Sequence, residues 1–145
     1  MMGFLNWFKE NPQEDDSTGS QLDLFGNSQE LAERRRVDGV TVRRNFTNTI
    51  EEKGGSKIAF GRSTEALTQE VMGCETRELY KQTGAKRGRR ETLPERAQEA
   101  LMTGEIVASH DLKQADIQGD QEQRDDQIVN SVRGSGKKVR RWFPW

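Results

Sequence analysis

The chain has 145 residues and a net charge of −1, and its hydrophobic and charged residues are nearly balanced, at 31% and 32%. This apolar supply predicts one small core and leaves part of the chain unfolded. A single cysteine, Cys74, excludes an internal disulfide. No apolar run approaches the roughly 20 residues of a membrane span, and no secretory signal is recognised. We therefore expect a cytoplasmic protein without a membrane partner.

The low net charge hides blocks of opposite sign. Residues 34–90 hold fourteen Lys or Arg and seven Asp or Glu, and residues 133–145 hold five basic residues and no acidic one. The stretches 1–33 and 91–132 are acidic. Basic blocks indicate anionic partners, nucleic acid first, although pairing with the acidic helix between them explains the same pattern.

The first 36 residues are predicted to form an arm. Phe4, Trp7 and Phe8 share one face of a short helix. This face either packs on the core or anchors a partner protein. Residues 11–20 are polar and acidic and contain Pro and Gly, which indicates a linker. A short helix over residues 29–36 is expected to follow.

Two short strands are predicted next, at residues 37–42 and 57–60, with a turn at the Gly-Gly-Ser of residues 54–56. A helix capped by Ser63 or Thr64 then ends at Gly73-Cys74. A second short helix covers residues 76–83, with Gly84 after it. This pair loosely resembles a helix-turn-helix, but any two packed helices give that pattern.

Residues 92–95, Thr-Leu-Pro-Glu, predict a capping box that opens a helix to about Leu112. Its buried face is predicted to hold Ala97, Ala100, Leu101, Met102, Ile106 and Val107. A final helix runs from Asp120 to about Val132 and is expected to end at the Gly-Ser-Gly of residues 134–136. The fold class is therefore mostly α: a small helical domain over residues 37–145, with one or two short strands and a disordered N-terminal arm.

The segment Gln21-Leu22-Asp23-Leu24-Phe25 resembles the bacterial sliding-clamp-binding pentapeptide, whose common form is Gln-Leu-Ser/Asp-Leu-Phe. All five positions agree, and average residue usage gives such a match on the order of once in several thousand chains of this length. The resemblance implies that Leu24 and Phe25 fill an apolar clamp pocket, with Leu22 adding contact and Gln21 reaching a neighbouring subsite. Alternatively, these residues pack on the domain as a hydrophobic staple.

Residues 79–132 are similar to the C-terminal region of the DNA-damage-inducible protein D family. The similarity rests on the helix after Thr92-Leu93-Pro94, the break at residues 116–119 and the Val132-Arg133 step. That family's large N-terminal domain is absent from this chain. The resemblance implies a DNA-damage or mobile-element setting rather than a reaction.

Basic residues near both ends of the C-terminal half are candidate phosphate contacts. They are Lys86, Arg87, Arg89, Arg90, Lys137, Lys138, Arg140 and Arg141. The ending Trp142-Phe143-Pro144-Trp145 suits base stacking, a partner anchor or folding back onto the core. His110 is the single histidine and no phosphate-binding glycine loop occurs, so neither catalysis nor a cofactor or metal is predicted.

These patterns predict a non-enzymatic, nucleoid-associated accessory protein of bacterial or phage origin. Its predicted partners are the DNA polymerase sliding clamp and, non-specifically, DNA. It would act in DNA replication or DNA-damage repair, as a helper or as an inhibitor of the replisome. The alternatives are a DNA-binding regulator of the DNA-damage-inducible type and a phage structural protein with a buried pentapeptide.

Overall fold

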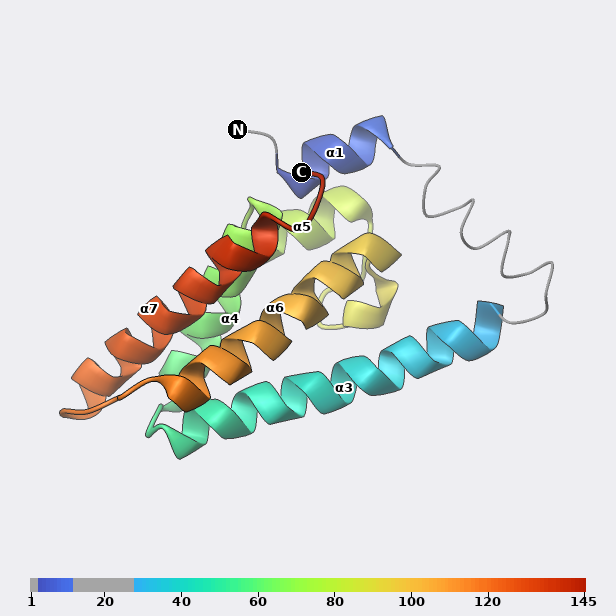
Figure 1. The fold of residues 1–145 in the computed structure, drawn as a ribbon. Helices are drawn as coiled ribbons and strands as arrows, with labels where there is room; N and C mark the ends of the chain where they lie inside the picture. Colours follow the sequence, from blue (N-terminus) through green and yellow to red (C-terminus); the bar gives the residue numbers. More distant parts are fainter. Residues whose placement is uncertain (1–2, 12–27) are drawn as a thin grey trace.

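The computed structural model describes residues 3–11 and 28–145 as a helical bundle without a strand in that part of the chain (Figure 1). In chain order the elements are α1 (Phe4–Glu10), α3 (Ser28–Glu52), α4 (Lys57–Met72), α5 (Thr76–Thr83), the 3-10 helix η1 (Arg90–Thr92), α6 (Glu95–Gln114) and α7 (Gln121–Arg140). The described helices include none long and apolar enough to cross a membrane. The predicted mostly helical class is confirmed.

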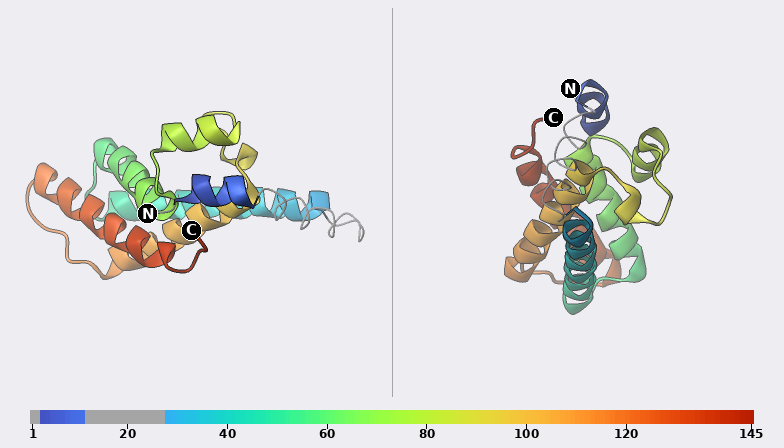
Figure 2. Two further views of the ribbon diagram at one scale, coloured as in Figure 1. Left: turned by 90° about the horizontal axis from the view of Figure 1, so that it is seen from above. Right: turned by 90° about the vertical axis from the view of Figure 1, so that its right-hand side faces the viewer.

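Helix α6 packs against α3, α4 and α7, and α4 also lies along α7 (Figures 1 and 2). The buried positions of α7 follow a helical spacing of three and four residues, which defines one inward stripe. Members of the shared core include Phe46, Ile50, Leu67, Val71, Met72, Leu101, Leu112, Ile128 and Val132.

The two predicted short strands are wrong. Residues 37–42 lie inside α3, and residues 57–60 form the first turn of α4. Phe46 and Ile50 are fully buried one helical turn apart, so packing of α3 on α6 outweighs a short alternating pattern. Ile58 is 69% exposed and supplies no buried strand face.

Helix α3 also replaces the short helix predicted over residues 29–36. It runs without a break from Ser28 to Glu52, so the domain boundary predicted between residues 36 and 37 falls inside a helix. The first turns of α3 extend beyond the other helices (Figures 1 and 2). Phe46 is its first buried residue among the side chains that the structure describes.

The turn predicted at residues 54–56 is present and begins α4. The Ser56 hydroxyl oxygen accepts a hydrogen bond from the amide of Ala59 at 3.3 Å, so this residue caps the helix instead of residue 63 or 64. Asp125 of α7 accepts bonds from the Ser56 amide at 3.0 Å and hydroxyl at 2.5 Å. The hydroxyl bond lowers the pKa of Asp125. This buried carboxylate therefore fixes the start of α4 to α7.

The ends of α4 and α5 confirm the sequence prediction. Gly73 and Gly84 close the two helices with left-handed φ angles of 75° and 74°. Glycine favours this conformation because it has no Cβ atom to clash with the backbone. The bounds of the short helix, residues 76–83, are as predicted.

Helix α6 has the predicted extent but a different start and a different buried face. Pro94 occupies the cap position, while the Thr92 hydroxyl donates to the Arg89 carbonyl in the preceding loop at 2.5 Å. The capping box is therefore wrong. Ala97, Ala100 and Leu101 are buried as predicted. Ile106 is 52% exposed, because its neighbour Glu105 takes the inward position.

Helix α7 passes through the glycines that were predicted to end it and continues to Arg140. Gly136 is buried against α4, where an added Cβ atom would lie 2.8 Å from the Cβ of Glu70. The Ser135 hydroxyl donates to Asp111 of α6 at 2.6 Å. These small residues allow α7 to approach its neighbours closely, so they serve packing rather than termination.

The two ends of the described chain lie side by side (Figures 1 and 2). Trp145 Nε1 donates to the Val71 carbonyl at 2.7 Å, and its ring centroid lies 4.9 Å from that of Phe4 and 5.2 Å from that of Trp7. These contacts are worth roughly 0.5–1.5 kcal/mol per ring pair beyond area burial. For Trp145 the core alternative is therefore confirmed, whereas Trp142 is 63% exposed.

Candidate functional site

A buried carboxylate lies where α3, η1 and α6 meet. Glu105 Oε2 accepts a hydrogen bond from Arg43 Nη1 at 2.6 Å, and Glu105 Oε1 accepts one from Arg90 Nη1 at 2.5 Å. The Glu105 side chain is 1% exposed, and those of Arg43 and Arg90 are 34% and 24% exposed. A carboxylate removed from water needs such partners. We call these three residues the arginine–glutamate cluster.

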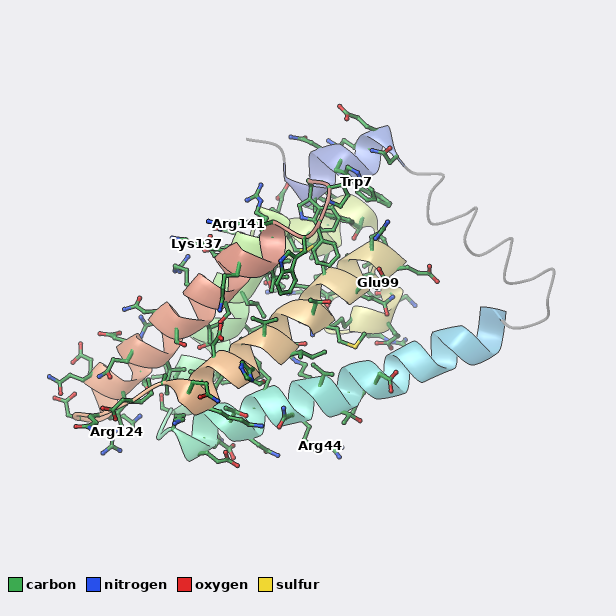
Figure 3. The ribbon with its side chains drawn as sticks, in the orientation of Figure 1. Trp7, Arg44, Glu99, Arg124, Lys137 and Arg141 are labelled. Carbon is green, nitrogen blue, oxygen red and sulfur yellow. The ribbon has the colours of Figure 1, made fainter. Side chains whose placement is uncertain are left out.

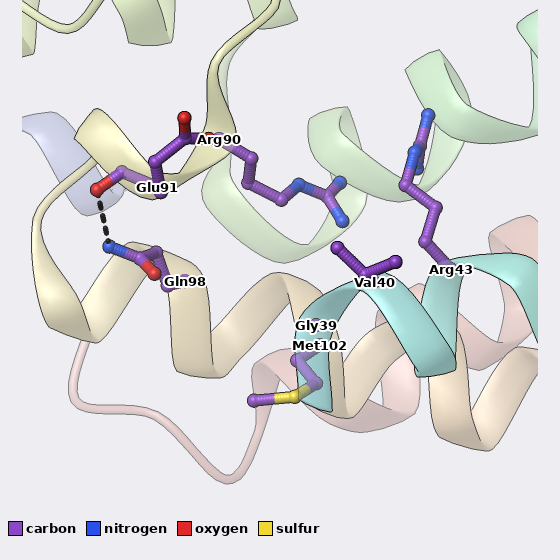
Figure 4. Close-up of a pocket in the computed structure, with 7 residues that line it drawn as sticks. All are labelled: Gly39, Val40, Arg43, Arg90, Glu91, Gln98 and Met102. Atoms are coloured by element: carbon purple, nitrogen blue, oxygen red, sulfur yellow. Dashed lines mark hydrogen bonds between the residues drawn. The ribbon is translucent and has the colours of Figure 1, made fainter. Parts of the chain in front are cut away.

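The three residues of the arginine–glutamate cluster come from three different helices. Glu105 lies one helical turn from Leu101 on the buried face of α6. Arg43 lies on α3 three positions before the buried Phe46, and Arg90 opens η1. In Figure 4, the Arg90 side chain extends from η1 toward Arg43 of α3. The cluster therefore joins residues far apart in the chain and holds the loop before α6 against α3.

Helices α4 and α5 complete the surroundings of the cluster. The Arg43 guanidinium carbon lies 5.0 Å from the centroid of the Phe60 ring, a cation–π arrangement, and its Nη2 lies 3.5 Å from Thr64 Oγ1. Tyr80 of α5 lies close to Arg90 and Arg43. Burial raises the pKa of Tyr80, and the nearby charges of Arg90 and Arg43 oppose that rise.

Two pockets flank the cluster and share Arg43 and Arg90. The smaller, of about 100 Å³, lies between α3, η1 and α6, with Val40 and Met102 in its wall (Figure 4). The Gln98 amide closes one edge by donating to the Glu91 carbonyl at 3.3 Å. The larger, of about 310 Å³, lies toward α4 and α5, and we call it the arginine pocket. It is at the lower end of the size range of small-molecule sites.

The basic residues of the loop that was predicted to contact DNA differ in their surroundings: some form ion pairs and others are exposed. Arg90 is turned inward to Glu105, so it serves the interior rather than the predicted surface. Arg89 Nε pairs with a Glu91 carboxylate oxygen at 3.0 Å. Lys86 and Arg87 are exposed and form no ion pair with the part of the chain that the structure describes.

The basic end of α7 is divided in the same way. Lys138 Nζ pairs with Asp111 of α6 at 2.7 Å, which fits the expected alternative of pairing with the acidic helix. Lys137 and Arg141 are exposed and project near the end that carries Trp7 (Figure 3). Together with Arg140, they line an open pocket of about 600 Å³. The exposed Trp142 follows directly in the chain.

The pentapeptide at residues 21–25 lies outside the described residues. The described chain stops at Asn11, after α1, and resumes at Ser28, the first residue of α3. Within residues 3–11 and 28–145, no group of three or more His, Cys, Asp or Glu side chains is arranged to hold a metal ion. In comparisons with known proteins, no family model, curated protein or solved structure matches the chain.

Neither Arg43 nor Glu105 was predicted from the sequence as a site residue. One signal was available for Glu105, because it occupies the apolar stripe of α6 between Leu101 and Ala108, at spacings of four and three residues. A charged residue on such a stripe predicts a buried pair. No comparable signal marks Arg43, since its role depends on how α3 packs on α6.

Proposed function

We propose that the protein is a non-enzymatic accessory factor that docks on the bacterial DNA sliding clamp through residues 21–25. The observation that carries the proposal is the complete five-position match to the clamp-binding pentapeptide. Burial of Leu24 and Phe25 in an apolar pocket contributes roughly 1.5–3 kcal/mol each. Ordering the peptide subtracts from this gain. The expected dissociation constant is therefore micromolar, which corresponds to a binding free energy of about −8 kcal/mol.

The position of the motif between two described elements supports its presentation to a partner. The pentapeptide ends three residues before α3 begins. Ser28 and Phe46 are 18 positions apart, a helical rise of about 27 Å. The start of α3 therefore stands well away from the first described buried residue of that helix. Docking on a clamp already loaded on DNA would also raise the local concentration of the basic residues at the DNA.

Replacing Leu24 and Phe25 together by alanine is expected to abolish clamp binding in isothermal titration calorimetry, because both pocket-filling side chains are removed. Asp23→Ser is the matched control, since the pentapeptide pattern accepts either residue there, and it should bind as the wild type does. A free peptide covering residues 20–26 should bind the clamp and compete with the protein.

Two results would contradict the clamp proposal. The first is equal clamp binding by the wild type and the double variant, or none by the wild type at tens of micromolar clamp. The second is a double variant that melts several degrees lower, which would place the pentapeptide in the core. That outcome favours the regulator or phage structural alternatives.

A second candidate function, weak and non-specific DNA binding, is favoured by three exposed residues near the end of α7: Lys137, Arg141 and Trp142, which directly follows Arg141 in the chain. Lys and Arg neutralise phosphate charge, and an exposed indole can stack on a base. The candidate DNA-binding surface is limited to this end of α7. Its affinity for DNA is expected to fall steeply as the salt concentration rises, because counterions are released on binding.

Changing Lys137 and Arg141 together to glutamine is expected to weaken binding to all DNA sequences alike and to flatten the salt dependence, as measured by fluorescence anisotropy at low salt. The matched control removes two exposed charges elsewhere, by Arg44→Gln with Arg124→Gln (Figure 3). Equal weakening by both pairs would mean that net charge alone acts, and the candidate surface would be withdrawn.

A further inference from the structure

The arginine pocket brings three cations to one cavity. Arg43 comes from α3, Arg87 from the loop after α5, and Arg90 from η1. The residues that line the pocket are Arg43, Thr64, Thr68, Thr76, Leu79, Tyr80, Arg87, Gly88, Arg90 and Leu101, none of which is acidic. Glu105, bound to two of the arginines, is the counter-charge of the cluster. Three positive charges and one negative charge leave an excess of two positive charges.

The pocket also has donors that the protein leaves unused. The Tyr80 hydroxyl belongs to the pocket wall near Arg90, and it can donate its hydrogen to an acceptor seated in the pocket. Arg87 is exposed and makes no ion pair with a described residue. The Thr64 and Thr68 hydroxyls, by contrast, donate to backbone carbonyls of α4 at 3.0 Å each. The unused donors therefore lie on the side of the pocket formed by α5 and the following loop.

Thr76, at the start of α5, gives an independent indication of a missing acceptor. Its hydroxyl oxygen is buried, and it is one of three buried side-chain polar atoms without a hydrogen-bond partner in the described chain. Buried hydroxyl groups are normally hydrogen-bonded. Because Thr76 is part of the pocket wall, a ligand oxygen seated there would supply the partner.

We propose that the arginine pocket binds the phosphate group of a small phosphate monoester. A phosphate dianion matches the two excess positive charges, and its terminal oxygens can accept bonds from Arg87, Arg90 and Tyr80. Planar guanidinium groups suit this anion because they donate two parallel hydrogen bonds to its oxygens. The pocket's volume of about 310 Å³ leaves room for part of the esterified group. This site is separate from the pentapeptide, so the inference stands independently of clamp docking.

The test is calorimetry of the full chain with two probes, phenyl phosphate and inorganic phosphate, in buffers matched for ionic strength with sodium chloride. Phenyl phosphate is expected to bind with a submillimolar dissociation constant and more tightly than inorganic phosphate. Equal affinity for both would overturn the assignment to an ester and leave a site for free phosphate. The absence of heat with either probe at several millimolar would overturn the site itself.

Single substitutions locate the binding. Arg87→Gln is expected to weaken phenyl phosphate binding about tenfold or more, and Tyr80→Phe, which keeps the ring, several-fold. Arg89→Gln is the matched control, because it removes the same charge from the same loop outside the pocket, and its affinity should stay within about twofold. Arg87 is exposed, so its variant should melt like the wild type.

Three further outcomes decide the matter. Equal weakening by Arg87→Gln and Arg89→Gln would show diffuse charge attraction and overturn the proposal. Binding of a single-stranded oligonucleotide that needs Arg87, without binding of phenyl phosphate, would make the pocket a nucleic-acid contact and overturn it too. Unchanged phenyl phosphate binding by the Leu24→Ala, Phe25→Ala double variant would support a site independent of the clamp motif.

Discussion

Replacing Glu105 by alanine is expected to lower the free energy of unfolding by about 2–4 kcal/mol. The change leaves Arg43 and Arg90 without the carboxylate that they share, and removal of one partner from a buried ion pair typically costs about 3–5 kcal/mol. The lower range applies because the two arginine side chains are 34% and 24% exposed and regain part of their hydration. Urea unfolding followed by circular dichroism measures the difference.

Glu99→Ala is the matched control for this prediction, because Glu99 lies on the same helix with a side chain that is 46% exposed. Its loss should change stability by less than about 0.5 kcal/mol. A triple variant with Glu105→Leu, Arg43→Met and Arg90→Met should recover most of the stability, since apolar residues of similar size often replace buried ion pairs without loss. Equal stability of Glu105→Ala and the wild type would show that the cluster is dispensable for the fold.

Leu101→Ala is expected to lower the free energy of unfolding by about 2–4 kcal/mol, because the leucine is 2% exposed and its truncation leaves a cavity in the core. The same experiment on Ile106→Ala should show a change of less than about 0.5 kcal/mol, since Ile106 is 52% exposed. Urea midpoints and slopes of the two variants, measured side by side, provide the check.

Comparing Leu101→Ala with Ile106→Ala tests directly which face of α6 is turned toward the core. Both substitutions remove an aliphatic side chain of similar size from the same helix, so helix propensity and side-chain volume are nearly matched. Similar losses for both would mean that α6 presents a broader apolar face than the structure gives. A larger loss for Ile106→Ala would reverse the assignment of the inward position to Glu105.

Several local features were readable from the sequence because their causes are local. Gly73 and Gly84 mark the ends of α4 and α5, since a left-handed residue after a helix strongly favours glycine. The apolar positions Ile128, Val129 and Val132 repeat at helical spacing and are buried in α7. Such signals depend on the backbone and on nearest neighbours, and they predicted the mostly helical class.

Other local patterns gave wrong predictions, because the same residues serve a different purpose in the packed molecule. Gly136 lets α7 approach α4 instead of ending the helix. Residues 37–42, predicted as a strand, lie within α3. These local preferences are worth about 1 kcal/mol per residue, and burial of Phe46 and Ile50 against the core outweighs them.

The sequence by itself determined the helical class, the ends of α4 and α5, and the pentapeptide match on which the clamp proposal rests. Only the tertiary structure decided which basic residues face inward. Arg90 and Lys138 pair with acidic residues of α6, whereas Arg87 and Lys137 are exposed. The physical reason is that the composition of a basic segment is the same whether its side chains are exposed to solvent or paired with carboxylates. Its pairing depends on contacts between residues distant in the chain, which local patterns do not contain.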